Sequence, residues 1–141
     1  MAIRKFNYEF DGVNYYRFSV YRLGSNVQTV YAFVVGDVLI DTAQSLNRSN
    51  IEKVVQKHPI SKIILTHHHE DHSGNVAYLM ETLNIDAYAH PECVDILKNG
   101  LKVSPLSRLL SGSVGEAHLK PLYEKDIIYT NDYALHPIYA P

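Results

Sequence analysis

Apolar residues in the first part of the chain come in strand-like segments. VNYYRFSVYRL (residues 13–23) and VQTVYAFVV (27–35) are rich in β-branched and aromatic residues, so both are predicted to be strands. The stretch VVGDVLID (34–41) predicts a hairpin with Gly36 and Asp37 as a two-residue turn. The second strand of this hairpin is expected to end at Asp41.

A first helix is predicted next. Ser49 and Glu52 fit a capping box, in which the two side chains satisfy backbone amides at the helix start. An apolar face follows at helical spacing, and Pro59 ends the pattern. The apolar positions of this face are Ile51, Val54 and Val55.

Strands and helices then alternate. KIILT (62–66) and IDAYA (85–89) are short apolar runs, as expected of buried strands. A helix is predicted between them from the spacing of Val76, Leu79, Met80 and Leu83, and another from Pro91 to Gly100. DIIYT (126–130) and YALHPIYA (133–140) are predicted strands around a turn at residues 131–132, whereas residues 101–121 are left without an assignment. This alternation predicts an α/β layered domain.

Composition excludes several classes of protein. A chain of 141 residues fits one domain, and its net charge of -2 gives no basic surface for nucleic acid or anionic lipid. No apolar run approaches the ~20 residues of a membrane helix, and the N-terminus has no signal-peptide core. The single cysteine, Cys93, is interpreted as a packing residue and fits a reducing compartment. We therefore expect a cytoplasmic protein.

The stretch ILTHHHEDHSGNV (64–76) concentrates metal-binding side chains where a strand is predicted to pass into a helix near Gly74. Residues two apart on extended backbone face the same side, so His67 and His69 can share one metal ion. Asp71 and His72 can both turn toward a second ion where the chain curls into the helix. Imidazole and carboxylate ligands suit zinc, iron or manganese.

The neighbours of these residues have a simpler interpretation. His68 and Glu70 are predicted to point to the other side and to be structural or solvated. Ser73 is expected to help start the helix. The alternative for the whole cluster is a set of solvated loop histidines that bind no metal.

Residues 67–72 match the pattern H-x-H-x-D-H, which resembles the signature of the metallo-β-lactamase fold superfamily. VVGDVLIDT resembles the hairpin before that family's supporting aspartate, a role that falls on Asp41. KIILTHHHEDHSGN resembles its strand, ligand loop and helix start. YALHPIYAP resembles the strand before its next ligand loop, P-G-H, with Pro141 at the proline. The resemblance covers nearly the whole chain.

The resemblance implies that residues 1–141 are the N-terminal half of an αββα sandwich, a single truncated domain without its C-terminal half. It assigns His67 and His69 to one metal and Asp71 and His72 to a second, with Asp71 serving catalysis by metal-assisted activation of water. Asp41 would orient a ligand histidine. A third histidine, a bridging aspartate and a last histidine have no counterpart, and three other histidines match no ligand position: His90, His118 and His136. Partial occupancy by one or two zinc ions, or by iron or manganese, is therefore expected.

The implied function is a metal-dependent hydrolase of an ester, thioester, lactone or phosphodiester that is inactive without the rest of the protein. The complete D-H pair resembles thioesterase-like and lactonase-like members more than true β-lactamases. His69 stands where flavodiiron proteins have glutamate, which disfavours an oxygen-reducing di-iron site. The alternative is a non-catalytic fragment or self-association module. In both cases a sheet face without its partner sheet predicts a homo-oligomer, or association with the missing half.

Overall fold

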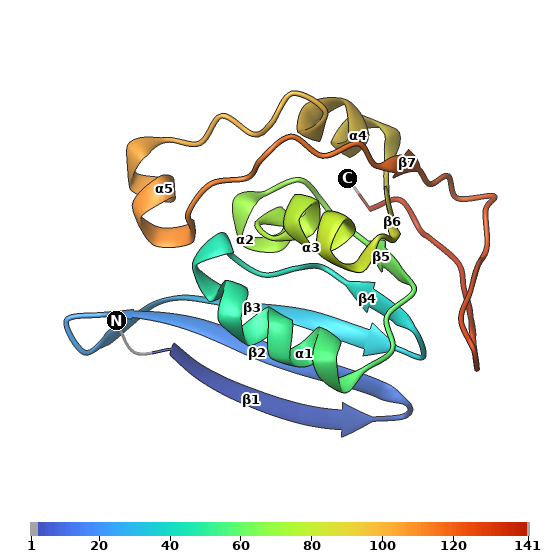
Figure 1. Cartoon of the computed structure of the whole chain (residues 1–141), viewed down its shortest axis with the longest axis horizontal. Coiled ribbons are helices and arrows are strands. Elements are labelled where there is room, and N and C mark those ends of the chain that lie inside the picture. Colours follow the sequence, from blue (N-terminus) through green and yellow to red (C-terminus); the bar gives the residue numbers. More distant parts are fainter. Residues whose placement is uncertain (1–2, 141) are drawn as a thin grey trace.

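A mixed seven-stranded sheet forms the body of the chain, and helices cover one of its faces (Figure 1). The computed structural model describes the backbone of residues 3–140 and the side chains of residues 7–140. The predicted match of Pro141 to the P-G-H motif lies outside these residues. The α/β layered fold is confirmed.

The strands follow one another in chain order across the sheet, from β1 to β7. The first four pair in antiparallel fashion, and β5, β6 and β7 continue in parallel from β4. Their bounds are β1 Ile3–Phe10, β2 Val13–Arg22, β3 Ser25–Val35, β4 Val38–Ile40, β5 Lys62–Ile64, β6 Asp86–Ala89 and β7 Lys120–Pro121. The predicted two-residue turn between β3 and β4 is confirmed, since Val35 pairs with Val38.

Helical segments connect the parallel strands, as crossover connections require. They are the 3-10 turn η1 Ser45–Asn47 and the helices α1 Arg48–Lys57, α2 Glu70–Ser73, α3 Val76–Leu83, α4 Pro91–Leu97 and α5 Pro105–Ser111. The unassigned region 101–121 thus contains α5 and β7. The predicted strands near the C-terminus are shorter than expected and form a separate two-stranded sheet, β8 Ile128–Tyr129 with β9 Ala134–Leu135. No helix among residues 3–140 is long and apolar enough to cross a membrane.

The predicted capping box is wrong. The turn η1 runs directly into α1, so the residue before the helix is Asn47, which makes no side-chain cap. Ser49 lies inside the helix and is exposed, and Glu52 instead accepts a hydrogen bond of 2.5 Å from the Tyr78 hydroxyl of α3. Glu52 therefore ties two helices together rather than capping one.

The two faces of the sheet have separate apolar clusters, because successive strand residues point to opposite sides. On one side, Phe18, Leu39 and Ile63 are completely buried under α1, α3 and α4. On the other side, a smaller cluster is formed with residues from the C-terminal segment: Val38, Ile40, Ile64, Tyr88, Leu122, Ile128 and Leu135. The β8–β9 segment thus covers the β4–β6 part of the face that the helices leave open.

The helix-free face carries a row of large apolar residues in register across six strands. Paired positions run in order through Tyr8, Tyr15, Phe33, Ile40, Ile64 and Tyr88. Tyr8 and Tyr15 stack with ring centroids 5.2 Å apart, and Tyr8 remains 46% exposed. The expected apolar face is therefore present, and its β1–β3 part is open.

The β3–β4 turn is tied to two distant segments through Asp37, and this generates a first prediction. The Asp37 carboxylate accepts hydrogen bonds from the Ser61 hydroxyl and, at 3.0 Å, from the Asn131 backbone amide. The Ser61 hydrogen bond lowers the pKa of Asp37. Asp37→Ala should lower the free energy of unfolding at pH 7 by about 1.5–3 kcal/mol, measured by urea denaturation.

The direction of the Asp37 pKa shift determines how this loss of stability depends on pH. Since the folded-state pKa lies below the ordinary 3.8, the carboxylate stabilises the fold above pH 3.8, and the contribution disappears as the pH falls through the folded-state value. The difference between the variant and the parent should therefore shrink in acid. Asp95→Ala, at an exposed position of α4, is the control and should stay within about 0.5 kcal/mol of the parent. An equal loss in both variants would contradict the role of Asp37.

Candidate metal centre

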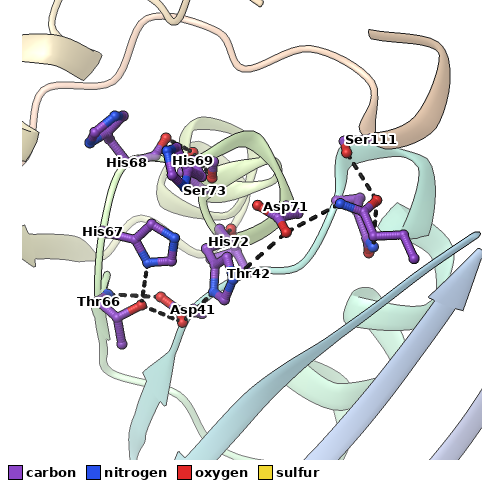
Figure 2. A network of polar contacts seen from close by, with 12 residues as sticks. Asp41, Thr42, Thr66, His67, His68, His69, Asp71, His72, Ser73 and Ser111 are labelled. Atoms are coloured by element: carbon purple, nitrogen blue, oxygen red, sulfur yellow. Dashed lines mark hydrogen bonds and ion pairs between the residues drawn. The ribbon is translucent and has the colours of Figure 1, made fainter. Parts of the chain in front are cut away.

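The predicted ligands converge just beyond the carboxyl end of β5 (Figure 2). One donor atom each of His67, His69 and Asp71 lies within 4.8 Å of the other two. The His72 Nε2 atom lies 3.8 Å from the Asp71 carboxylate, and the rings of His67 and His72 are 4.1 Å apart. The structure therefore brings all four side chains together, and their roles as ligands remain a prediction.

The backbone reaches this arrangement differently from the sequence-based expectation. The strand ends at Ile64, so His67 and His69 sit on a loop, and a short additional helix, α2, precedes the predicted helix, which is α3 and begins at Val76. Asp71 and His72 therefore lie on α2. His68 lies on the outer side of the cluster, away from Asp71 and His72 (Figure 2).

The expected role of Ser73 as a helix start is wrong. Ser73 is the last residue of α2 and is completely buried. Its hydroxyl donates to the carbonyls of His68 and His69, at 2.8 and 2.9 Å. These two hydrogen bonds hold the loop with His67 to His69 against the end of the short helix α2.

Asp41 contacts both segments that carry the predicted ligands, the loop after β5 and α2. Its carboxylate accepts hydrogen bonds from the Thr66 backbone amide at 2.8 Å and the Thr66 hydroxyl at 2.7 Å. The same carboxylate lies 2.8 Å from Nδ1 of His72 (Figure 2). Because Nδ1 is engaged in this way, Nε2 is the His72 atom that faces Asp71 and is available to a metal.

A buried loop after β4 holds α2 in place. The Thr42 backbone amide and hydroxyl both donate to the His72 carbonyl, at 2.7 and 2.9 Å. The Asn75 side chain donates to the carbonyls of Thr42 and Gln44, both at 2.8 Å. Thr42, Gln44 and Asn75 are completely buried, so these bonds are shielded from water.

The pKa values of His67 and His72 are shifted in opposite directions. Burial lowers the pKa of His67, and the neighbouring His72 lowers it further. Burial also opposes charge on His72, but the hydrogen bond to Asp41 and the charges of Asp41 and Asp71 outweigh it and raise the pKa of His72. The two shifts thus have opposite effects: the His67 ring is favoured in the neutral form that binds metals, and the His72 ring is favoured in the protonated form.

A further side chain, which no sequence pattern indicates, reaches Asp71. The Gln28 amide of β3 donates to the Asp71 carboxylate at 3.2 Å. Gln28 also accepts hydrogen bonds from Gln44 and from Ser111, the last residue of α5. Gln28 is 43 positions from Asp71, and no motif connects the two.

The other histidines and Cys93 do not belong to the group of three converging donors. His90 precedes α4 and stacks on Tyr139 with ring centroids 4.7 Å apart, whereas His118 and His136 are exposed. Cys93 is buried in the helix-side core, and burial raises its thiol pKa to about 11. Cys93 is therefore a packing residue and a poor nucleophile.

An apolar cleft opens beside the centre. It has a volume of about 780 Å³, and Thr66 and His67 form part of its wall. Its apolar walls come from the helix-free sheet face and the C-terminal segment, including Ile40, Ile64, Leu122, Leu135 and Ile138. The centre therefore borders a cleft with largely apolar walls on this side.

A family model described as the metallo-beta-lactamase superfamily matches residues 26–138. No curated protein matches the sequence. Solved structures of similar fold include the Rm3 metallo-beta-lactamase, with 19% identity and a TM-score of 0.66 over 90% of this chain and 48% of that one.

Two other solved structures have a similar fold. BJP-1, a subclass B3 metallo-beta-lactamase of Bradyrhizobium japonicum, shows 17% identity and a TM-score of 0.66 over 92% of this chain and 50% of its own. FIM-1 from Pseudomonas aeruginosa, in its mono-zinc form, shows 20% identity and a TM-score of 0.60 over 91% and 54%. The chain thus spans about half the length of these structures.

The packing beneath α2 predicts that a side chain at Gly74 destabilises the fold. A Cβ atom at Gly74 would clash with the Ser45 backbone nitrogen and would lie 2.7 Å from the Ala43 carbonyl oxygen. Gly74→Ala should therefore force the supporting loop away from α2 and cost about 1–3 kcal/mol in thermal or urea unfolding.

Gly115→Ala is the matched control. A Cβ atom there would meet only the Ala77 methyl group, at 4.0 Å, so this variant should unfold like the parent. If Gly74→Ala were as stable as Gly115→Ala, the close contact between the loop and α2 would be disproved.

Proposed function

Because the chain belongs to the metallo-β-lactamase superfamily, we propose that it carries the metal-binding part of a metal-dependent hydrolase. The observation that carries this proposal is the convergence of His67, His69 and Asp71 within 4.8 Å, next to a His72 that Asp41 orients. Outer hydrogen bonds of this kind fix ring orientation and tautomer at metal sites.

The donor set fits zinc, with iron or manganese as alternatives. His67, His69 and Asp71 would hold one ion, and His72 with Asp71 would contribute to a second. A catalytic zinc ion has three protein ligands and an open position, so this group is enough for one ion and too small for two. We therefore propose partial occupancy in this chain.

A zinc ion at this place would supply Lewis-acid activation of water for attack on a carbonyl or phosphoryl centre. The protein contributes orientation: Asp41 fixes His72, and the loop after β4 fixes α2. The apolar cleft beside His67 can receive the non-reacting part of a substrate. We propose an ester, thioester, lactone or phosphodiester as the substrate class.

Turnover is proposed to need more protein than these 141 residues. The solved relatives are about twice as long, and the cluster supplies too few ligands for a two-metal site. We expect negligible hydrolysis of thioesters, lactones and phosphodiesters by this chain alone. Metal-dependent turnover that is lost in His67→Ala would show instead that this half is sufficient. We also propose a cytoplasmic location, because the single cysteine is a buried thiol.

The second candidate, an association module, is favoured by the open apolar row on the helix-free face. Tyr8 and Tyr31 are 46% and 40% exposed there, beside the half-buried Tyr15 and Phe33. Apolar surface costs about 25 cal/mol per Å² when it is left in water. We therefore propose that another copy of the chain, or the complementary half of the domain, covers this row.

Metal binding can be tested with neighbouring histidines. His67→Ala removes a converging donor and should weaken zinc or cobalt binding by more than the ~10–100-fold typical of losing an outer contact. His68→Ala changes the adjacent histidine, which lies outside the converging group, and should bind like the parent. Isothermal titration and metal analysis after dialysis would measure both. Equal binding by the two variants would contradict the proposed site.

Association can be tested on the same protein. Phe33→Glu places a charge in the apolar row and should convert a dimer or larger oligomer to a monomer in light scattering. Gln56→Glu adds the same charge at an exposed position of α1 and should leave the oligomer intact. A parent chain that is already a monodisperse monomer would contradict association through this face.

A further inference from the structure

A chain of buried and half-buried side-chain amides leads to the Asp71 carboxylate. Asn50 donates to Asn47 at 3.3 Å, and Asn47 donates to Gln44 at 2.7 Å. Gln44 donates to Gln28 at 3.2 Å, and Gln28 donates to Asp71 at 3.2 Å. Every amide in this series thus turns its NH₂ group toward the next residue and toward the carboxylate.

The hydrogen bonds of this series fix the orientation of the Gln28 amide, its last member. Asn47 and Gln44 are completely buried, so water does not compete for their polar atoms. The Gln28 oxygen accepts from Gln44 and, at 3.0 Å, from the Ser111 hydroxyl. If the Gln28 amide were flipped, its NH₂ group would meet the Gln44 NH₂ group and its oxygen would face the Asp71 carboxylate, and both contacts would be repulsive.

We infer that Gln28 is a positioning residue for the metal centre, and this inference rests on the metal site proposed above. Its amide holds Oδ2 of Asp71, the oxygen that lies 3.8 Å from Nε2 of His72, and so fixes how the carboxylate faces the neighbouring histidines. Asp41 has the corresponding effect on His72 from the opposite side. The hydrogen bond from Ser111 connects this orientation to α5, which the ligand motif does not include.

Satisfaction of buried polar groups alone would also produce such a chain, so the test needs a readout that responds to ligand geometry. Gln28→Met keeps the length of the side chain and removes its amide. With the whole chain and cobalt ion as the probe, this variant should bind about 10–100-fold more weakly than the parent. The visible absorption spectrum of the bound cobalt should also change, since it reports the arrangement of the ligands.

Two further variants serve as a control and as a partial disruption of the Gln28 contacts. Asn26→Ala lies on the same strand, where the exposed Asn26 amide donates to Thr29, and it should leave both cobalt affinity and spectrum unchanged. Ser111→Ala removes one of the two donors to Gln28 and should give a smaller loss of affinity than Gln28→Met. If Gln28→Met kept the parent's affinity and spectrum while His67→Ala lost binding, the positioning role would be overturned and the metal site would stand.

A measurement without metal separates the two proposals further. Thermal unfolding of Gln28→Met, Asp71→Ala and the double variant forms a double-mutant cycle. The melting-temperature loss of the double variant should be smaller than the sum of the single losses, because both changes remove the same contact. Strictly additive losses would overturn the contact between Gln28 and Asp71. A parent chain that binds no cobalt would overturn the metal site, and the cycle would still decide this contact.

Discussion

The arrangement of the site depends on one buried carboxylate, that of Asp41. It is 1% exposed, and its oxygens contact the backbone and hydroxyl of Thr66 and the ring of His72. These contacts connect the end of β4 to the ligand loop after β5 and to α2. A buried charge is tolerated only when hydrogen bonds replace its lost hydration, and Asp41 obtains them from the segments that carry the candidate ligands.

The backbone reaches this position at some cost. Asp41 and Ala43 have φ values of 61° and 56°, in the left-handed region where non-glycine residues are strained by about 1–3 kcal/mol each. The bend turns Thr42 toward the His72 carbonyl and brings Gly74 close to Ser45. The hydrogen bonds of the Asp41 carboxylate and of Asn75 offset this strain, which explains why strained backbone and close packing occur beside the candidate ligands.

The sequence predicted the elements whose signal is local. The hairpin at Gly36 and the converging cluster could be anticipated because each depends on neighbouring residues. The same argument could have found β1, since Asp11 and Gly12 form a two-residue turn of the kind that marks hairpins, with φ values of 49° and 75°. Predictions failed where a side chain expected to cap its own helix instead forms hydrogen bonds with another segment of the chain. Glu52 bonds to Tyr78 of another helix instead of capping its own, and Ser73 bonds to the carbonyls of the ligand loop.

Gln28 shows the limit of motif reasoning most clearly, because its contact with Asp71 exists only once β3 lies beside α2. The consequence is a centre with two unequal halves. Asp71 and His72 are held on both sides, by Gln28 from β3 and by Asp41 from the end of β4. His67, by contrast, is hydrogen-bonded at 3.0 Å to its own neighbour Thr66 and borders the apolar cleft. The predicted ligands Asp71 and His72 therefore depend on contacts with distant strands, whereas the position of His67 depends mainly on its own loop.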